Sequence, residues 1–305
     1  MKIIETECPL CGSKNNYSVI YKSNFNLSDL NPEIFSARRL PDQTHYQIVR
    51  CNNDNLIRSN PICDSPCIEA LYKNSKFNYA EQIGNLTVSY LNVLNKALQS
   101  LSKDAIILEI GCGNGFILKA LLGKGFTNVY GIEPSKDAAI NANPKIKDKI
   151  TVDILKNGLY KNETFDLIFF FQTFDHIHNP NVFLGICYNL LKPGGTILAL
   201  NHDVKSLSAK ILKEKSPIVD IEHMYLYSKE TMNKIFILAD FTPLKIFSPK
   251  NVISLRYLIW LFPLPKNIKL KLLNLKGLFF NFLFKINLRL SLGNLCIIAT
   301  KPIKK

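Results

Sequence analysis

The middle of the chain alternates short apolar runs with helical periods. Strands are predicted at residues 106–110, 129–132, 150–154, 167–171 and 196–200. Apolar positions three and four apart predict helices within residues 81–101 and at residues 117–122, 137–141 and 182–191. Strand and helix therefore follow each other in turn, which predicts a parallel sheet with helices on both faces.

Two further strands are predicted late in the chain, at residues 244–247 and 295–299, which brings the sheet to seven strands. Ser228 is suited to cap a helix that runs to about residue 238. Residues 1–75 are polar, rich in cysteine and weakly periodic, so we expect a small module there. Residues 76–305 then form the main domain, with a helical insertion at about residues 251–293.

The charge of the chain is concentrated at one end. Lys and Arg outnumber Asp and Glu by 38 to 24, and residues 245–305 hold 12 of these basic residues and no acidic one. We expect no secretory signal, because Glu5 and Glu7 follow the first few residues at once. We expect no membrane span, because no run of about 18 uncharged apolar residues is present. The eight cysteines then favour a cytoplasmic protein that binds metal rather than one with disulfides.

An apolar run ends in Glu109 and is followed by glycines at alternate positions, Gly111, Gly113 and Gly115. Such glycines let the backbone turn sharply and approach a ligand at the carboxyl end of a parallel sheet. The spacing departs from the G-x-G-x-x-G loop of dinucleotide sites, since Phe116 stands where the third glycine would be. A carboxylate at Glu109 would repel a pyrophosphate and attract a cation, so the loop indicates a positively charged, nucleotide-like ligand.

The same segment resembles the first motif, E/D-x-G-x-G-x-G, of the class I S-adenosylmethionine-dependent methyltransferases. Further matches follow in the family's order, at residues 162–168, 171–177 and 192–195. The resemblance covers about residues 80–248 and the last strand. It implies a Rossmann-like α/β fold with a seven-stranded, mostly parallel sheet, and a cofactor, S-adenosyl-L-methionine, that carries two positive charges and no phosphate.

The resemblance also implies which residues hold this cofactor. Glu133 would accept hydrogen bonds from both ribose hydroxyls; the alternative is a surface acid in a turn. Asp153 or Ile154 would flank the adenine ring. The full set expected at the cofactor is Glu109, Gly111, Cys112, Gly113, Glu133, Pro134, Ile154, Phe171 and Gln172.

Candidates for the transfer step follow the fourth and fifth strands. Methyl transfer requires an aligned acceptor, and a base if the acceptor is neutral. His176 follows the fourth strand, where the family places residues near the methyl group, and histidine accepts protons near neutral pH. His223 and Tyr225 lie in a segment that resembles the E-H-h-x-x-F-S of related enzymes, and His202 ends the fifth strand. We therefore expect His176, His223 and Tyr225 at the acceptor, with His202 as a further candidate.

Two other interpretations of this region stay open. Asp175 and His176 would, in the first, only cap and pack the following helix. In the second, Asp175, His176 and His178 would bind a metal ion for metal-assisted O-methyl transfer, although the sequence shows no second carboxylate cluster nearby.

The N-terminal cysteines predict a structural zinc site. Cys8 and Cys11 form one half, Cys-Pro-Leu-Cys-Gly. Residues 50–61 resemble the R-C-x-x-C-G-L-h-x-x-x-P of methyltransferases with an N-terminal zinc-binding module, including sugar C-methyltransferases, with Asp54 in place of the second cysteine. This implies the ligands Cys8, Cys11, Cys51 and Asp54. Thiolates from Cys63 and Cys67, or a module that has lost its zinc, are the alternatives.

The insertion at about residues 251–293 combines Leu, Phe and Trp with interspersed Lys and Arg. Its most apolar runs are residues 258–264 and 278–284. A cationic apolar segment suits an anionic membrane surface, and its acceptor would then be lipid-linked. A helical lid or a subunit interface is the alternative. Nucleic acid is disfavoured, because clustered Phe beside Leu indicates burial rather than base stacking.

These features predict a methyltransferase that acts on a small molecule or a saccharide, and therefore a place in saccharide biosynthesis. We expect it in the cytoplasm, with peripheral contact at the inner face of the membrane through residues 251–293. The alternatives are a non-catalytic binding or assembly protein with the same fold, and an RNA methyltransferase.

Overall fold

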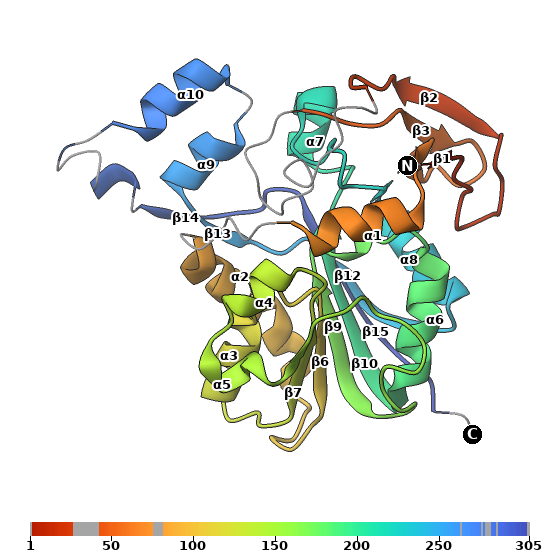
Figure 1. Cartoon of the computed structure of the whole chain (residues 1–305), viewed down its shortest axis with the longest axis vertical. Coiled ribbons are helices and arrows are strands. Elements are labelled where there is room, and N and C mark those ends of the chain that lie inside the picture. The colour runs from red at the N-terminus through yellow and green to blue at the C-terminus, as the bar shows by residue number, and fades with distance from the viewer. Residues whose placement is uncertain are drawn as a thin grey trace.

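The computed structural model describes residues 2–26, 43–75, 82–262, 264–275, 277, 282–284 and 286–303. A seven-stranded sheet in the order β12-β15-β10-β9-β6-β7-β8 forms its centre (Figure 1). β8, β7, β6, β9 and β10 are parallel, and β15 is antiparallel to both its neighbours, β10 and β12. The strands are β6 (Ile107–Ile110), β7 (Val129–Ile132), β8 (Ile150–Thr151), β9 (Phe165–Phe171), β10 (Leu191–His202), β12 (Thr242–Phe247) and β15 (Asn294–Thr300). The predicted Rossmann-like α/β fold is confirmed.

Helices cover both faces of this sheet. Successive residues of a strand point to opposite sides, so each central strand contributes side chains to the core on either face. Phe169 and Phe171 of β9 pack in one core with α2 and α3, whereas Ile168 and Phe170 pack in another with α6 and α8. Burial on both faces explains why β9 is a nearly continuous apolar run. The helices are α2 (Ile83–Leu98), α3 (Phe116–Gly123), α4 (Lys136–Ile140), α5 (Pro144–Lys147), α6 (Pro180–Leu190) and α8 (Lys229–Leu238).

Some predicted boundaries differ from the structure. β8 ends at Thr151, because its neighbour β7 ends opposite, at Ile132, and offers no further ladder partner. The strand predicted at residues 196–200 begins earlier, because residues 192–195 form an irregularity inside β10, where the pairing with β9 shifts between Leu191 and Thr196. The predicted cap at Ser228 is confirmed as a reciprocal pair of hydrogen bonds with Thr231.

The N-terminal module shares its core with the main domain. Its sheet has the order β11-β4-β3-β2, and β11 (Tyr225–Leu226) comes from the main domain. Its buried Cys51 and Ile62 belong to the same core cluster as Phe170 of the central sheet. The module is therefore built onto the main domain rather than tethered to it. Its elements are β1 (Ile3–Ile4), β2 (Tyr17–Tyr21), β3 (Ile48–Cys51), β4 (Ile57–Ser59), β5 (Ile62–Cys63) and α1 (Ser65–Lys73).

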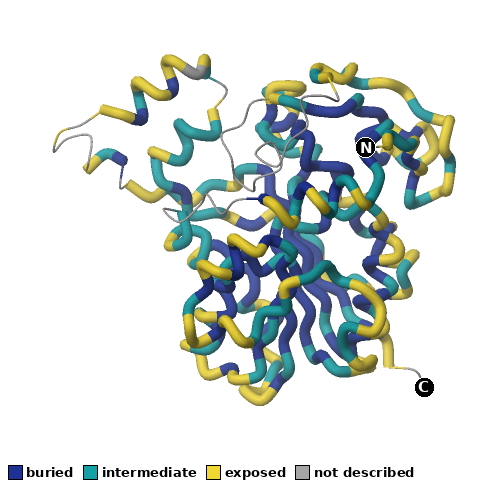
Figure 2. The backbone as a smooth tube through the Cα atoms, in the orientation of Figure 1, coloured by how far each residue is buried: buried dark blue, intermediate teal, exposed yellow. Residues whose placement is uncertain are grey.

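The insertion lies between β12 and β15 and contains strands as well as the predicted helices. Antiparallel β13 (Asn251–Ser254) and β14 (Asn287–Leu290) frame α9 (Leu255–Leu261) and α10 (Lys266–Leu273). Figure 1 shows α9 and α10 projecting beyond α2, and Figure 2 shows the central strands buried while much of α10 is exposed. The predicted apolar residues 278–281 lie outside the described residues. Within the described part of the chain, no helix is long and apolar enough to cross a membrane.

Candidate functional site

A cavity of about 1610 Å³ opens where β6, β7, β9 and β10 end. Ligands bind at this edge of open parallel sheets because the loops after successive strands meet there. One part of the cavity lies against the glycine loop after β6. A second lies against histidines that follow β9 and β10, and a third against α9 and α7 (Leu207–Leu212). The volume exceeds the roughly 300–1,000 Å³ of an ordinary small-molecule pocket, so there is room for a cofactor and a second ligand.

The glycine loop holds its backbone close to the cavity. Gly111 has a φ of +73° and donates its N–H to the carbonyl of Ile132 at 2.8 Å. A Cβ on Gly111 would lie 2.5 Å from Oγ1 of Thr173. Gly115 has a φ of +69° and precedes the first residue of α3. Both positions therefore need glycine for conformation, and Gly111 also needs it for space.

Two carboxylates are buried beside this loop. Glu109 is 3% exposed, and its Oε2 has no hydrogen-bond partner within the described part of the chain. Glu133 is 9% exposed and accepts the N–H groups of Gly113 and Ser135, each at 2.8 Å. Burial raises the pKa of Glu109 well above its ordinary value, and the charge of Glu133 adds to this. Burial also raises the pKa of Glu133, against the lowering effect of its two N–H donors. A cationic ligand would offset the cost of ionising Glu109.

The other residues predicted at the cofactor line the same cavity. They are Cys112, Gly113, Pro134, Ile154, Phe171 and Gln172. Gln172 directly follows β9 with a φ of +52°, a backbone conformation that few non-glycine residues adopt and that is common at functional sites. Asp153 lines the cavity beside Ile154, so both candidates for the adenine edge are present. The fold thus gathers the whole predicted set from loops after four strands.

The histidines gather around a buried aspartate. Asp175 is 1% exposed and lies in the 3₁₀ helix η3 (Phe174–His176). Its carboxylate oxygens lie 3.6 Å from Nε2 of His176 and 3.9 Å from Nε2 of His223. Nδ1 of His223 lies 2.9 Å from the carbonyl oxygen of Ile218, to which it donates, so Nε2 is left to accept a proton. Burial raises the pKa of Asp175, whereas the charge of His223 lowers it.

Tyr72 belongs to this cluster although the sequence did not indicate it. It lies on α1 of the N-terminal module, and its hydroxyl is 2.8 Å from Nδ1 of His176, 104 positions further along the chain. Burial raises the pKa of Tyr72 well above its ordinary value, and the charges of Glu222 and Asp175 raise it further. The hydroxyl therefore stays protonated and is available as a hydrogen-bond donor to Nδ1 of His176. No local pattern marks such a residue, because only the docking of the module brings it to the cavity.

Two more carboxylates, Asp220 and Glu222, are buried in the wall beside the histidines. Glu222 lies in the segment that the sequence comparison with related enzymes had singled out, but neither acid was predicted as a site residue. Together with Asp175, which lies close to His176 and His223, they make this part of the protein acidic. The wall is therefore suited to hydroxyl groups, which donate hydrogen bonds to carboxylates, and hostile to phosphate.

The remaining acceptor candidates have different places. His202 lines the cavity, with its ring centroid 4.9 Å from that of His223. Tyr225 is not among the described residues that line the cavity: it is buried in β11, and its hydroxyl donates to the carbonyl of His178 at 3.3 Å. The structure thus places Tyr225 in the junction with the N-terminal module rather than in the acceptor wall. The side chains that converge on Asp175 are those of His176 and His223, and His178 is not part of that group.

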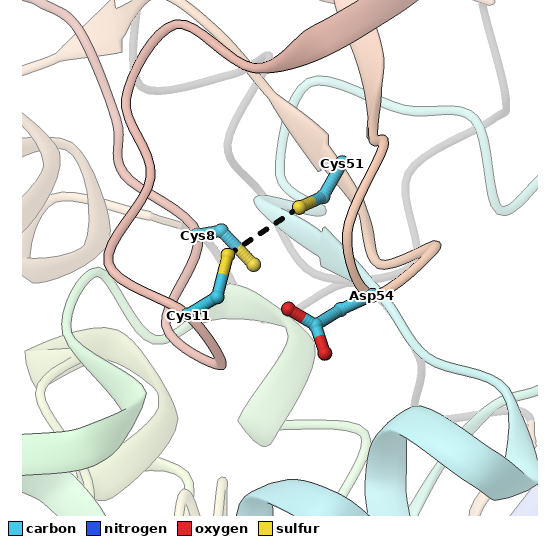
Figure 3. Close-up of side chains that lie close together, drawn as sticks. All are labelled: Cys8, Cys11, Cys51 and Asp54. Atoms are coloured by element: carbon cyan, nitrogen blue, oxygen red, sulfur yellow. Dashed lines mark hydrogen bonds between the residues drawn. The ribbon is translucent and has the colours of Figure 1, made fainter.

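Cys8, Cys11, Cys51 and Asp54 converge on one point of the N-terminal module (Figure 3). Their candidate ligand atoms all lie within 4.8 Å of one another, and Sγ of Cys11 lies 3.6 Å from Sγ of Cys51. Three sulfurs and a carboxylate oxygen form a donor set that suits tetrahedral zinc.

The turns that carry these ligands keep the geometry of a metal-binding knuckle. Asn55, where related sequences have glycine, adopts a φ of +60°, which asparagine tolerates better than most residues. Cys63 and Cys67 are not in the group, because their sulfurs contact each other at 3.1 Å. The residues present therefore fit the predicted ligand set.

Comparison with known proteins agrees with this geometry. A family model described as a methyltransferase domain matches residues 83–246, which is more than half of the chain. The tRNA U34 carboxymethyltransferase of Cellvibrio japonicus is 35% identical over 104 residues, covering 32% of each chain. The mitochondrial ubiquinone biosynthesis O-methyltransferase of Rattus norvegicus is 31% identical over 111 residues, covering 33% of this chain and 32% of that protein. The chain thus spans about a third of the length of these curated relatives.

Solved structures share the fold at lower identity. A [4+2]-cyclase covers 80% of this chain and 98% of its own, with a TM-score of 0.52 and 13% identity. A methyltransferase of Haloferax volcanii, solved with the Trm112 methyltransferase activator, covers 74% of this chain with a TM-score of 0.52 and 16% identity. A cyclase among these neighbours shows that the fold alone does not determine the reaction.

We expect Glu109→Gln to stabilise the ligand-free protein and to weaken its binding of S-adenosylhomocysteine and S-adenosylmethionine. The pKa of Glu109 is higher in the folded state than in the unfolded state, so its protonated form stabilises the fold at pH values below the unfolded-state pKa. This contribution to stability is lost as the pH rises through the folded-state pKa. The variant should therefore unfold at a higher temperature than wild type at pH 8. The difference should disappear near pH 4, below the ordinary glutamate pKa of 4.5. Calorimetric titration should show S-adenosylmethionine bound at least about tenfold more weakly, which is about 1.4 kcal/mol.

Glu230→Gln is the matched control for this prediction. Glu230 is exposed, and hydrogen bonds from Ser228 and other donors lower its pKa to about 2, so its removal should lower stability at pH 8 and leave cofactor binding unchanged. Equal unfolding temperatures of Glu109→Gln and wild type at pH 8, or equal affinities for S-adenosylmethionine, would contradict the role of Glu109.

Proposed function

The chain belongs to the class I S-adenosylmethionine-dependent methyltransferase family, and on that premise we propose that it methylates a hydroxyl-bearing small molecule of the saccharide class. The observation that carries the proposal is that one cavity joins Glu109 and the glycine loop to the Asp175 cluster. The first part suits a cationic cofactor, and the second suits an acceptor that must lose a proton.

The acidic wall supports a sugar-like acceptor. Asp220 and Glu222 line the cavity, and a carboxylate is suited to accept hydrogen bonds from the hydroxyl groups of a ligand. RNA is the second candidate, because one relative is named as a tRNA carboxymethyltransferase. A phosphate backbone would meet like charge from these acids, and proteins that bind nucleic acid use basic residues at the phosphates. The wall therefore favours a neutral acceptor over RNA.

We assign the base to His223 within this proposal. S-adenosyl-L-methionine, when bound, would supply the methyl group and become S-adenosylhomocysteine, and Nε2 of His223 would take the proton that the acceptor oxygen or carbon loses. Asp175 stabilises the imidazolium that forms, and Tyr72 holds His176 beside it through a 2.8 Å hydrogen bond.

The competing proposal is a protein that keeps the fold without turnover. It would not need a buried Glu109 at the cofactor or paired histidines on a buried aspartate. Both features cost folding free energy, since burial disfavours the charged forms of the acids. Their presence together in one cavity favours an active enzyme.

We expect His223→Asn to lower the rate of S-adenosylhomocysteine formation by about 10²–10⁴-fold, the usual contribution of a general base. The rate is measured with soluble and lipid extracts of cells as acceptor pools. S-adenosylmethionine affinity should stay within about twofold of wild type, because His223 lies outside the predicted cofactor set. His45→Asn is the control: His45 is a buried histidine of the N-terminal module away from the cavity, and this variant should keep the wild-type rate. A wild-type rate for folded His223→Asn would exclude His223 as the base.

Treatment with a chelator distinguishes general-base catalysis by His223 from metal-assisted transfer. If His223 is the base, dialysis against EDTA should leave the initial rate unchanged as long as the N-terminal module stays folded. Loss of the rate, restored by Mg²⁺ and not by Zn²⁺, would instead assign the Asp175 cluster to a metal and contradict the base.

We also propose a structural zinc ion at Cys8, Cys11, Cys51 and Asp54. The convergence of three thiols and a carboxylate supports it. Burial raises the pKa of Cys8 to about 12, and a bound zinc ion would hold such a thiol as thiolate. Zinc fully enclosed by protein ligands stabilises a fold and has no open position for catalysis.

We expect one zinc ion per chain after purification with zinc in the medium, measured by metal mass spectrometry. Asp54→Ala should lose the ion and unfold at a lower temperature, whereas Asp54→Cys should keep it. Cys63→Ser is the control, because Cys63 lies outside the group, and it should keep the ion. Zinc-free wild type, or equal zinc in wild type and Asp54→Ala, would reject the site.

A further inference from the structure

The cavity extends beyond the Asp175 cluster into a compartment between α7 and α9. Its walls include Leu207 and Ile211 on one side and Leu258, Trp260 and Leu261 on the other, with Phe284 nearby. These side chains are apolar or nearly so, unlike the acidic wall beside the histidines. The cavity therefore has a polar part next to the site of transfer and an apolar part further out.

The helices that form this compartment leave apolar side chains uncovered. Leu207 and Ile211 of α7 are 74% and 67% exposed. None of the seven residues of α9 is buried, although their sequence is Leu-Arg-Tyr-Leu-Ile-Trp-Leu. Exposed apolar surface of this extent usually marks a binding site. Because α7 and α9 present it to a common cavity, the occupant must be apolar and must reach the Asp175 cluster from there.

Charge around this compartment is unbalanced. Residues 245–305 contain no acidic residue and 12 basic ones, and Lys210, Lys213 and Lys215 are exposed at and beyond the end of α7. Exposed Phe262, Ile268 and Leu270 lie among the basic residues of α9 and α10. Glu214 is the one acid among the exposed lysines that follow α7, and the insertion itself has none. Apolar side chains mixed with an excess of lysine suit the surface of an anionic bilayer.

We propose that the acceptor is an amphiphile taken from an anionic membrane surface, with its polar head at the Asp175 cluster and its apolar chain between α7 and α9. This inference rests on the proposed function, because the head is the group that is methylated. The cavity volume of about 1610 Å³ accommodates such a molecule beside the cofactor. The insertion both lines the chain compartment and contacts the bilayer, so the acceptor reaches the site without entering water.

Trp260 offers a direct test, since it is the only tryptophan of the chain and lines the compartment. The probe is a vesicle of phosphatidylglycerol with brominated acyl chains, because bromine quenches tryptophan on contact. We expect quenching of Trp260 in the full-length protein, little quenching by brominated phosphatidylcholine, and at least tenfold weaker binding at high salt. Ile211→Asp should need at least tenfold more vesicle for the same quenching.

Ile140→Asp is the matched control for Ile211→Asp. Ile140 on α4 is 68% exposed, and it is not among the described residues that line the cavity. The same substitution there should leave quenching at the wild-type level. Equal loss in both variants, or no quenching of the wild type by either lipid, would overturn the proposal. Emission that changes with protein concentration and not with vesicles would also overturn it, because a second copy of the chain would then cover the insertion.

Calorimetric titration with S-adenosylhomocysteine separates this inference from the proposed function. If the wild-type protein binds S-adenosylhomocysteine but its tryptophan is not quenched, the membrane-borne acceptor is rejected and the proposed methyltransferase function stands. If the tryptophan is quenched but the protein binds no S-adenosylhomocysteine, the proposed function is rejected, and the amphiphilic acceptor is rejected with it. The same titration shows that Ile211→Asp and Ile140→Asp are folded.

Discussion

A carboxylate that is buried without a compensating donor constrains the whole cavity. Glu109 lies in β6, between β7 and β9 at the centre of the sheet, and its Oε2 has no hydrogen-bond partner within the described part of the chain. The nearby carboxylate of Glu133 accepts hydrogen bonds from the N–H groups of Gly113 and Ser135. Its charge raises the pKa of Glu109 further and does not compensate for the burial of Glu109. A positive charge brought in by a ligand would offset the cost of ionising Glu109 here. The glycine loop and the strand ends hold that ligand against the two acids.

The second acidic group, at Asp175, is then explained by the movement of charge during the proposed transfer. Methyl transfer from a bound sulfonium would remove one positive charge from the part of the cavity that Glu109 and Glu133 line. A proton taken up by His223 places a new positive charge beside Asp175. Positive charge thus moves from one buried acidic group to the other. The cavity keeps its net charge through the step, which limits the electrostatic part of the barrier.

The predictable parts of the site are those in which a residue type suited to the chemistry stands at the end of a predicted strand. Glu109 lies near the end of β6, and Gly111 and Glu133 directly follow β6 and β7, so the rule that parallel strands end at one edge was enough to bring them together. Tyr72 was missed because it depends on the docking of α1 onto the main domain. Tyr225 was misplaced by a motif comparison, since its pairing with β4 in the N-terminal module is not visible in the local sequence. The strands that frame the insertion were missed for the same reason, because β13 and β14 pair across more than thirty residues.

Charge in this protein is separated between the inside and the outside of the cavity. Asp220 and Glu222 face inward beside the histidines, whereas the insertion and the end of α7 carry lysine and arginine. A soluble, phosphate-bearing acceptor would be attracted by the outer residues and repelled by the inner ones. A molecule with a neutral hydroxylated head and an apolar chain meets no such conflict, because its head reaches the acids while its chain stays between α7 and α9. If the proposed membrane-borne acceptor is correct, the anionic partners of the outer lysines would be lipids that remain in the bilayer.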